Sequence, residues 1–334
     1  MKDKTAVLLI NVGTPENPTT KDVRKFLFEF LNDKYVIDLP FLLRKFLVNC
    51  IIVPFRAPKS AKLYQKLWDE KGSPLLYYSE SLKDKLQAKI SEKYEVFIGM
   101  RYGNPSIKEA IAAIKLQGFK KLICIPLYPQ YATSTTYTSI VEVNKQAKKQ
   151  ALDIDLEFID DFFHKQKFIE AITAQAKKYD LSKYDHIIFS YHGLPVNQTE
   201  NTHKGYSCKE LNCNTEYNPS NKYCYHAACY ATTRLLTKAL KLKEGQYITS
   251  FQSRLSKNWL EPFTDDIILE KAKEGKKNIL VFCPAFVADC LETTIEIAYE
   301  YDELFKQNGG EKLQLVESLN DSDAWVNCLA SLIN

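Results

Sequence analysis

The sequence lacks a concentrated excess of positive charge, and this absence argues against a nucleic-acid-binding protein. Lysine and arginine together number 45, aspartate and glutamate 41, and the two signs are interleaved along the chain. A protein that binds nucleic acid presents a concentrated basic face to the phosphates. Hydrophobic residues make up 45% of the 334 positions and charged residues 26%, so we expect a packed globular core and no disorder.

The N-terminal residues lack the apolar core and the small-residue cleavage site of a secretory signal peptide. We therefore expect a cytoplasmic protein whose nine cysteines are reduced. The most apolar segment, 36–55, contains Arg44 and Lys45, which excludes a membrane-spanning helix. Two interpretations of the segment remain. It is either a buried amphipathic helix, or an apolar lip that faces a hydrophobic substrate or makes peripheral contact with a membrane.

Nucleotide-binding motifs are also missing. The first apolar run ends in Asn11-Val12-Gly13-Thr14-Pro15, where a dinucleotide site needs GxGxxG and a P-loop needs GxxxxGK followed by Ser or Thr. Their absence disfavours NAD and ATP as ligands. Gly13 permits either a plain turn or the close approach of a flat ligand.

Short, continuously apolar runs alternate with longer helical patterns, as in parallel sheets covered on both faces. The alternation predicts an α/β fold with two doubly wound, Rossmann-like domains. We expect an N-terminal domain over 1–155, a C-terminal domain over 156–305, and an extension over 306–334 that adds a strand and a helix. The predicted strands are 6–12, 95–100, 121–126, 156–159, 186–191, 247–251, 278–282 and 313–317.

Candidate functional residues follow these strands, where ligands bind in such folds. His192 ends the strand 186–191, and an imidazole there can bind a metal or accept a proton. A lone histidine is more often structural. Arg101 and Tyr102 end the second strand and are suited either to holding an anion or to an ion pair at the rim. Tyr131, after the third strand, belongs to a hydroxyl-rich run that forms either a ligand-binding wall or a helix cap.

A stripe of acidic residues runs along one face of the helix predicted over 289–305. Its members fall within an arc of roughly 80° at helical spacing, and they are Asp289, Glu292, Glu296, Glu300 and Glu303. A solvated acidic face is the ordinary explanation. Like charges four residues apart nevertheless destabilise a helix, and carboxylates suit hydrated cations, so a cation-handling role is the alternative.

Four cysteines lie within one loop, 203–229. They are Cys208, Cys213, Cys224 and Cys229. Zinc and iron–sulfur clusters both use four thiolates, but the CxxC pairs of zinc ribbons are absent. His203 and His226 are alternative ligands, and unliganded thiols are a third interpretation.

Several motifs, in order along nearly the whole chain, resemble those of the ferrochelatase family. They are Ser190-Tyr191-His192-Gly193-Leu194-Pro195, Phe251-Gln252-Ser253-Arg254, Trp259-Leu260-Glu261-Pro262 and Asp289-Cys290-Leu291-Glu292-Thr293. The opening stretch 9–15, the turn at 72–75 and the pair Arg101-Tyr102 also match.

The resemblance implies a chelatase-like fold and insertion of Fe(II) into protoporphyrin IX to make heme, the terminal step of heme biosynthesis. It implies that His192 and Glu292 handle metal and protons together, and that Glu296 and Glu300 extend a path for cations or protons. The residues that it places around the porphyrin are Val12, Arg101, Tyr102, Tyr131 and Trp259. Some ferrochelatases carry extra cysteines on a [2Fe-2S] cluster, which Cys208, Cys213, Cys224 and Cys229 are expected to bind here.

Three alternatives stay open at this point. The substrate can be coproporphyrin, or the enzyme can load another metal into a different tetrapyrrole. The third alternative is a two-domain metal-binding protein without catalysis, although such binders are usually exported.

Overall fold

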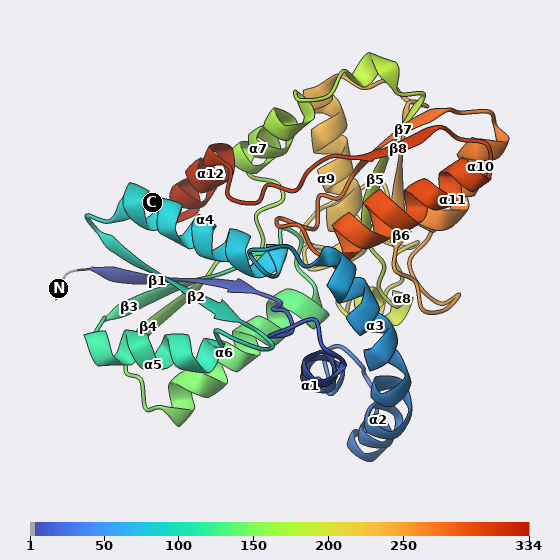
Figure 1. Ribbon diagram of the computed structural model, residues 1–334. Helices are drawn as coiled ribbons and strands as arrows, with labels where there is room; N and C mark the ends of the chain where they lie inside the picture. Colours follow the sequence, from blue (N-terminus) through green and yellow to red (C-terminus); the bar gives the residue numbers. More distant parts are fainter. Residues whose placement is uncertain (1–3, 334) are drawn as a thin grey trace. The chain divides into compact units, whose positions relative to one another are not determined.

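The structure is a computed structural model that describes residues 4–333, and these divide into two compact units (Figure 1). Unit 1 comprises Met1–Tyr128, Thr133–Asp160 and Leu329–Asn334, and unit 2 comprises Pro129–Ala132 and Asp161–Cys328. The main crossing from unit 1 to unit 2 therefore follows Asp160, whereas the sequence placed it at 155–156. Residues 306–328 belong to unit 2 and are not a separate extension.

Unit 1 is built on a parallel sheet with the strand order β2-β1-β3-β4. Its central strand β1 is apolar on both faces, as expected of a parallel strand with helices on either side. The strands are β1 (Thr5–Asn11), β2 (Tyr94–Met100), β3 (Lys121–Pro126) and β4 (Asp155–Phe158). The helices are α1 (Thr20–Leu31), α2 (Phe41–Phe46), η1 (Leu47–Ile52), α3 (Val53–Leu67), α4 (Pro74–Ile90), α5 (Ile107–Gln117), η2 (Thr133–Tyr137) and α6 (Thr138–Lys149).

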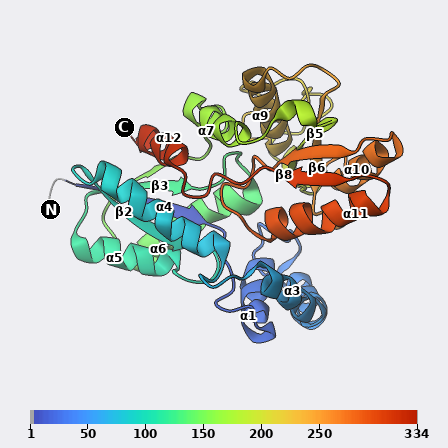
Figure 2. The same ribbon diagram turned by 45° about the horizontal axis from the view of Figure 1, so that its top comes forward.

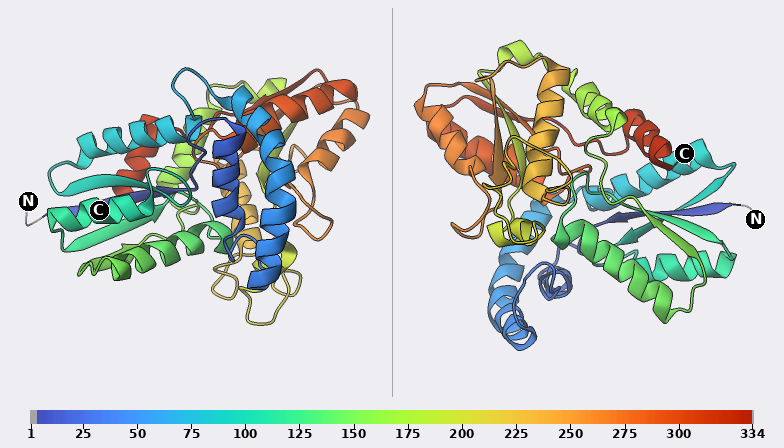
Figure 3. Two further views of the ribbon diagram at one scale, coloured as in Figure 1. Left: turned by 60° about the horizontal axis from the view of Figure 1, so that its bottom comes forward. Right: turned by 180° about the vertical axis from the view of Figure 1, so that it is seen from behind.

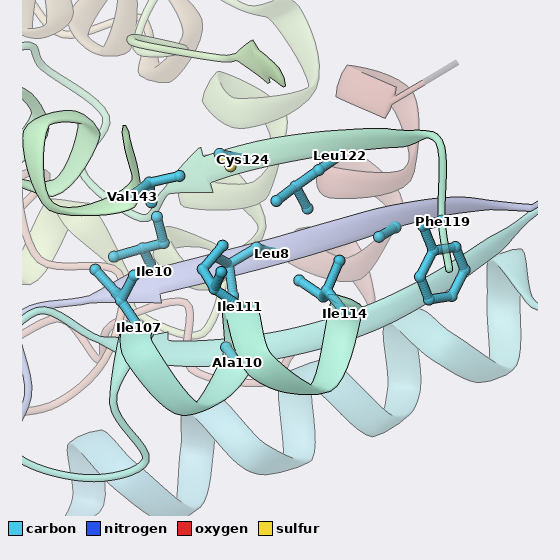
Figure 4. Packing of buried hydrophobic residues seen from close by; sticks show 11 residues of the cluster. Leu8, Ile10, Ile107, Ala110, Ile111, Ile114, Phe119, Leu122, Cys124 and Val143 are labelled. Atoms are coloured by element: carbon cyan, nitrogen blue, oxygen red, sulfur yellow. The ribbon is translucent and has the colours of Figure 1, made fainter. Parts of the chain in front are cut away.

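The apolar face of helix α5 explains its position against the sheet. Ile107, Ile111 and Ile114 recur at helical spacing and pack on Leu8 and Ile10, which share one face of β1 (Figure 4). A Ser106–Glu109 capping box begins the helix, and Gly118 ends it in the left-handed conformation. Each fully buried Leu or Ile in this layer stabilises the fold by about 1.5–3 kcal/mol.

Unit 2 repeats the same order with later strands, β6-β5-β7-β8, again all parallel. The strands are β5 (His186–His192), β6 (Tyr247–Gln252), β7 (Asn278–Phe282) and β8 (Lys312–Leu315). The helices are α7 (Gln166–Ala176), η3 (Leu181–Lys183), α8 (Val196–Glu200), α9 (Tyr225–Leu240), α10 (Thr264–Lys273), η4 (Leu291–Tyr301) and α11 (Asp302–Gln307). The last helix, α12 (Asp323–Ile333), ends in unit 1. The two predicted doubly wound α/β units are therefore confirmed.

Side chains alternate between the two faces of β5, and helices pack against each face. Ile188 packs with Ile268 of α10 and Ile297 of η4 on one face. On the other face the Tyr191 hydroxyl hydrogen-bonds to Thr233 of α9 across 2.9 Å. Figure 2 shows α10 and α11 on one side of this sheet and α7 and α9 on the other.

In both units the first strand lies between the second and the third. The chain therefore leaves β5 and β7 in opposite directions, and this divergence is the point at which open α/β sheets bind ligands. His192, the last residue of β5, and Glu292, which follows β7, lie at this point of unit 2.

The segment 41–67 is helical throughout, as α2, η1 and α3, and it buries apolar side chains that include Val48, Val53 and Leu67. Its exposed large apolar residues are Phe41, Leu42, Leu43, Phe46, Ile51 and Phe55. The segment therefore combines buried apolar side chains with an exposed apolar surface, and contact of that surface with a substrate or a membrane stays a prediction. Among residues 4–333, no helix combines the length and apolarity needed to cross a bilayer.

Candidate active site and metal site

His192 is the last residue of β5 and is half-buried. Its Nδ1 hydrogen-bonds to the carbonyl oxygen of Gly193 across 2.6 Å. Because a carbonyl oxygen only accepts, Nδ1 must carry the proton, and the neutral ring then has its lone pair at Nε2. The ring centroid lies 6.3 Å from that of Trp259 and 6.2 Å from that of Phe286. An imidazole with a nitrogen ready to accept a proton or a metal thus lies near two aromatic rings.

Gly193 allows the chain to pass close to its neighbours. A Cβ at this position would lie 2.8 Å from the Gln252 carbonyl oxygen and 3.2 Å from Cε3 of Trp259. Two backbone hydrogen bonds join the turn after His192 to the segment that carries Trp259. The Leu260 amide donates to the Leu194 carbonyl oxygen (2.9 Å), and the Val196 amide donates to the carbonyl oxygen of Asn258 (3.0 Å). The Gly-Leu-Pro turn therefore fixes Trp259 beside the histidine.

Glu292 lies in the first turn of η4, after β7, and is half-buried. The structure makes η4 a π-helix, where the sequence predicted one continuous α-helix over 289–305. Such helices are rare and recur at functional sites. A π-helix turns less per residue than an α-helix, so the arc calculated for the acidic stripe does not apply.

Gln252 connects the histidine strand to the glutamate helix. Its Nε2 donates to the Glu292 carbonyl oxygen (2.7 Å), and its Oε1 accepts from the Ser190 hydroxyl (2.8 Å). The side chain is buried, at 1% exposure. Sequence reasoning quoted Gln252 as part of a motif and gave it no role, since its partners are far away in the sequence.

Glu296 is more heavily bonded than a simple solvated acid. Its carboxylate accepts from the Ser253 amide (2.8 Å), the Ser253 hydroxyl (2.5 Å) and the Tyr301 hydroxyl (2.9 Å). Burial first, and the Glu296 charge second, raise the pKa of Tyr301. Exposure increases along the helix, from half-buried Glu292 and Glu296 to exposed Glu300.

In unit 1, three residues predicted to bind porphyrin come together where β1 and β2 end. The Arg101 amide donates to the Asn11 carbonyl oxygen (2.8 Å), and the Tyr102 amide donates to that of Val12 (3.0 Å). Gly13 is required at this crossing because its φ is +100° and a Cβ would lie 1.8 Å from the Tyr102 carbonyl oxygen. The group that approaches Gly13 closely is therefore the backbone of Tyr102.

Asp33 organises this group, and no motif in the sequence indicated it. Its carboxylate accepts from Arg101 (2.5 Å), the Tyr102 hydroxyl (2.8 Å) and the Thr138 hydroxyl (2.5 Å). Burial raises the pKa of the Tyr102 phenol, so the phenol stays a neutral donor. Arg101 and Tyr102 are thus fixed by a shared acceptor.

Tyr131 lies in unit 2, where its ring centroid is 4.9 Å from that of Tyr223. Tyr223 immediately precedes Cys224, one of the loop cysteines. A residue predicted to bind porphyrin therefore contacts the cysteine loop.

The backbone of the loop leads into the N-terminal end of α9 (Figure 3). The loop gathers a group of metal-binding side chains. The group consists of His203, Cys208, Cys213 and Cys224, whose donor atoms all lie within 4.8 Å of one another. Hydrogen bonds from the Cys208 and Cys224 thiols lower the pKa of the Cys213 thiol. One soft-ligand metal site is the chemistry that such donors support.

Cys229 is not a member of this group, although the sequence predicted it as the fourth ligand. It follows Cys224 by five residues along α9, which is about 7.5 Å of helix. It is fully buried, and burial raises the pKa of its thiol. Of the two alternative ligands, His203 joins the group, while the His226 ring packs 5.6 Å from Phe251.

Comparison with known proteins agrees with these motifs. The family model described as Ferrochelatase matches residues 4–334. A ferrochelatase of Legionella pneumophila (strain Lens) is 42% identical over 329 residues, covering 98% of both chains. A ferrochelatase of Coxiella burnetii (strain Dugway 5J108-111) is 40% identical over 338 residues, covering 99% of this chain and 93% of the relative.

Among solved structures, SirB from Bacillus subtilis with Fe3+ matches with a TM-score of 0.54. It is 12% identical, and the match covers 99% of this chain and 94% of SirB. At that identity the likeness shows the shared fold alone. The family match and the two relatives carry the identification: this chain belongs to the ferrochelatase family.

Proposed function

We propose that the protein inserts Fe(II) into protoporphyrin IX and releases heme. The observation that carries the proposal is the arrangement where the chain leaves β5 and β7. There Gln252 joins the strand that ends in His192 to the helix that begins with Glu292. The family match over residues 4–334 supports the same activity.

The chemistry of insertion explains why a base and a carboxylate are both needed. A free porphyrin has two pyrrole N–H protons, and both must leave as the cation enters. His192 has a lone pair at Nε2 because Nδ1 is committed to the Gly193 carbonyl oxygen. Glu292 adds a carboxylate, the ligand type that suits a hydrated divalent cation. We propose that the pair shares the transfer of metal and protons.

Glu296 and Glu300 continue this proposed path toward solvent. Their rising exposure along η4 supports a route by which hydrated cations arrive or protons leave. Val12, Arg101, Tyr102, Tyr131 and Trp259 stay the predicted porphyrin-binding residues.

Peripheral membrane contact of a cytoplasmic protein is a further part of the proposal. It is supported by Phe41, Leu42, Leu43, Phe46 and Phe55, which expose more than half of their surface on one helical segment. Exposed apolar groups gathered in this way are typical of interaction surfaces. A hydrophobic surface also favours protoporphyrin, the more apolar of the two candidate porphyrins. A [2Fe-2S] cluster in the loop stays a prediction from the family, and no step of the proposed reaction uses it.

An anaerobic fluorescence assay tests the activity. The untagged protein is mixed with Fe(II) and, in separate reactions, with protoporphyrin IX or coproporphyrin. The proposal predicts enzyme-dependent loss of fluorescence, with heme as the product and protoporphyrin as the preferred substrate. No loss above the uncatalysed rate with either porphyrin would refute catalysis, and preference for coproporphyrin would refute the substrate assignment.

A further inference from the structure

We propose that the cysteine loop binds a single tetrahedral zinc ion through His203, Cys208, Cys213 and Cys224. The proposal differs from the family-based prediction in the metal and in the ligands. A single ion takes the place of a binuclear cluster, and His203 takes the place of Cys229. It does not depend on the proposed reaction.

The separations between donor atoms match one metal centre. The Cys208 and Cys224 sulfurs are 3.7 Å apart, and the Cys213 sulfur lies 3.8 Å from Nε2 of His203. With Zn–S bonds of about 2.3 Å and a Zn–N bond of about 2.05 Å, a tetrahedron has edges of about 3.8 Å and about 3.6 Å. Two of the six edges therefore match a zinc tetrahedron, and no donor pair of the group is farther apart than 4.8 Å.

A [2Fe-2S] cluster needs a longer spacing. Its ligands divide between two irons, so ligands on opposite irons lie farther apart than the edge of one tetrahedron. All four donor atoms of this group lie within 4.8 Å of one another. Three thiolates and one imidazole are instead an ordinary ligand set of structural zinc.

The groups around the ligands orient them as metal sites require. Nδ1 of His203 hydrogen-bonds to the Tyr206 carbonyl oxygen (3.1 Å), so the proton lies there and the Nε2 lone pair points toward Cys213. The Asn221 amide donates to the Cys213 sulfur (3.6 Å), and the Ala227 backbone amide donates to that of Cys224 (3.4 Å). Donors to sulfur stabilise the thiolate form, which is the form that binds metal.

Burial separates the site from a chance surface cluster. His203, Cys213 and Cys224 are at most 1% exposed, and Cys208 is half-buried. Within the part of the chain that the structure describes, the apolar side chains clustered with the cysteines are Leu211, Tyr217 and Ala227. A metal ion would therefore supply much of the cohesion of this loop, as in small zinc domains.

The site is connected to the residues of the reaction. Cys224 is the N-cap of α9, and the first residue of that helix, Tyr225, hydrogen-bonds through its hydroxyl to the backbone of His192. Tyr223, on the other side of Cys224, packs against Tyr131. We expect loss of the ion to loosen this edge of unit 2.

Metal analysis of the untagged full chain tests the proposal. Protein purified anaerobically from cells supplied with both zinc and iron is assayed for zinc, iron and acid-labile sulfide. The expected result is about one zinc per chain without sulfide. Two irons and two sulfides per chain would overturn the proposal, and so would a folded protein without bound metal.

A pair of variants distinguishes the two ligand sets. His203→Ala is expected to lower zinc content at least tenfold, whereas Cys229→Ser keeps it, because Cys229 is outside the group. His203→Cys restores a full set of ligands and is expected to recover the ion, which separates ligand loss from misfolding. Loss of metal in Cys229→Ser together with retention in His203→Ala would contradict the assignment.

Discussion

The side-chain amide of Gln252 donates a hydrogen bond to the backbone carbonyl oxygen of Glu292 across 2.7 Å. The same amide group accepts from Ser190, two residues before His192. One buried side chain thus fixes the two proposed catalytic residues on the elements that carry them.

Gln252→Leu is expected to lower kcat by about 10–100-fold, the usual effect of losing a group that orients a metal-handling residue. It is also expected to lower the free energy of unfolding by about 1–3 kcal/mol, because the Ser190 hydroxyl and the Glu292 carbonyl oxygen each lose a hydrogen bond to this buried side chain. Steady-state insertion kinetics and urea unfolding measure the two effects separately.

Gln175→Leu is the matched control. Gln175 is also a buried glutamine of unit 2, and it donates to the Ser318 carbonyl oxygen across 2.7 Å. The Gln175→Leu variant should show a similar fall in the free energy of unfolding, while its kcat stays near the wild-type value. An equal fall in kcat in both variants would show that Gln252 acts through stability alone.

Asp33→Ala should destabilise unit 1 by about 3–5 kcal/mol, because it leaves the largely buried Arg101 side chain, 13% exposed, without its anion. Asp33→Asn keeps a hydrogen-bond acceptor, so its free energy of unfolding is expected to fall less than that of Asp33→Ala. Denaturant unfolding of both variants checks the order. A loss below about 0.5 kcal/mol in the alanine variant, the scale of an ordinary surface substitution, would show that the group is not the support described.

His186 should make the protein less stable in acid. Burial first, and the Lys271 charge second, lower the pKa of His186 to about 4. As pH falls below about 6.5, the unfolded chain gains a proton that folded His186 does not accept until about pH 4, so stability falls across that window. His186→Leu should remove on the order of 2 kcal/mol of this pH dependence, allowing for solvent screening. Unchanged dependence between about pH 7 and about pH 4.5 in urea unfolding would refute the assignment.

The exposed apolar residues of 41–55 should bind lipid. Replacing Phe41, Leu42 and Phe46 by serine removes about 1 kcal/mol of partial burial each, and the affinity for anionic phospholipid vesicles should fall about 100-fold. Leu116→Ser is the control, because Leu116 is 88% exposed but lies on α5. Vesicle sedimentation measures both. Wild-type binding by the triple variant, or equal loss in the control, would rule out this surface.

Continuous apolar runs made the strands predictable, and β3 and β7 begin and end where the sequence placed them. The helices over 41–67 were harder, because six of their large apolar side chains are exposed while others, such as Val48 and Val53, are buried. Gln252 and Asp33 were missed as site residues for another reason. Their partners lie 40 and 68 residues away, so only the fold brings them together.

The fourth member of the metal-binding group could not be predicted from the sequence for a similar reason, because it too depends on how the chain folds. Counting cysteines favoured Cys229, but helical geometry carries it along α9, away from Cys224. His203 reaches the group because the loop folds back, a feature that spacing does not encode. The π-helical form of η4 was likewise invisible to a period of 3.6 residues.

The central claim is that His192 acts directly on metal or protons, and one rate measures it. Fe(II) insertion into protoporphyrin by His192→Ala, followed by loss of fluorescence, should be at least about 100-fold slower than by the wild type. His164→Ala, which alters a half-exposed histidine of unit 2, should keep the full rate. A His192→Ala protein with the wild-type unfolding curve and the wild-type rate would contradict the account.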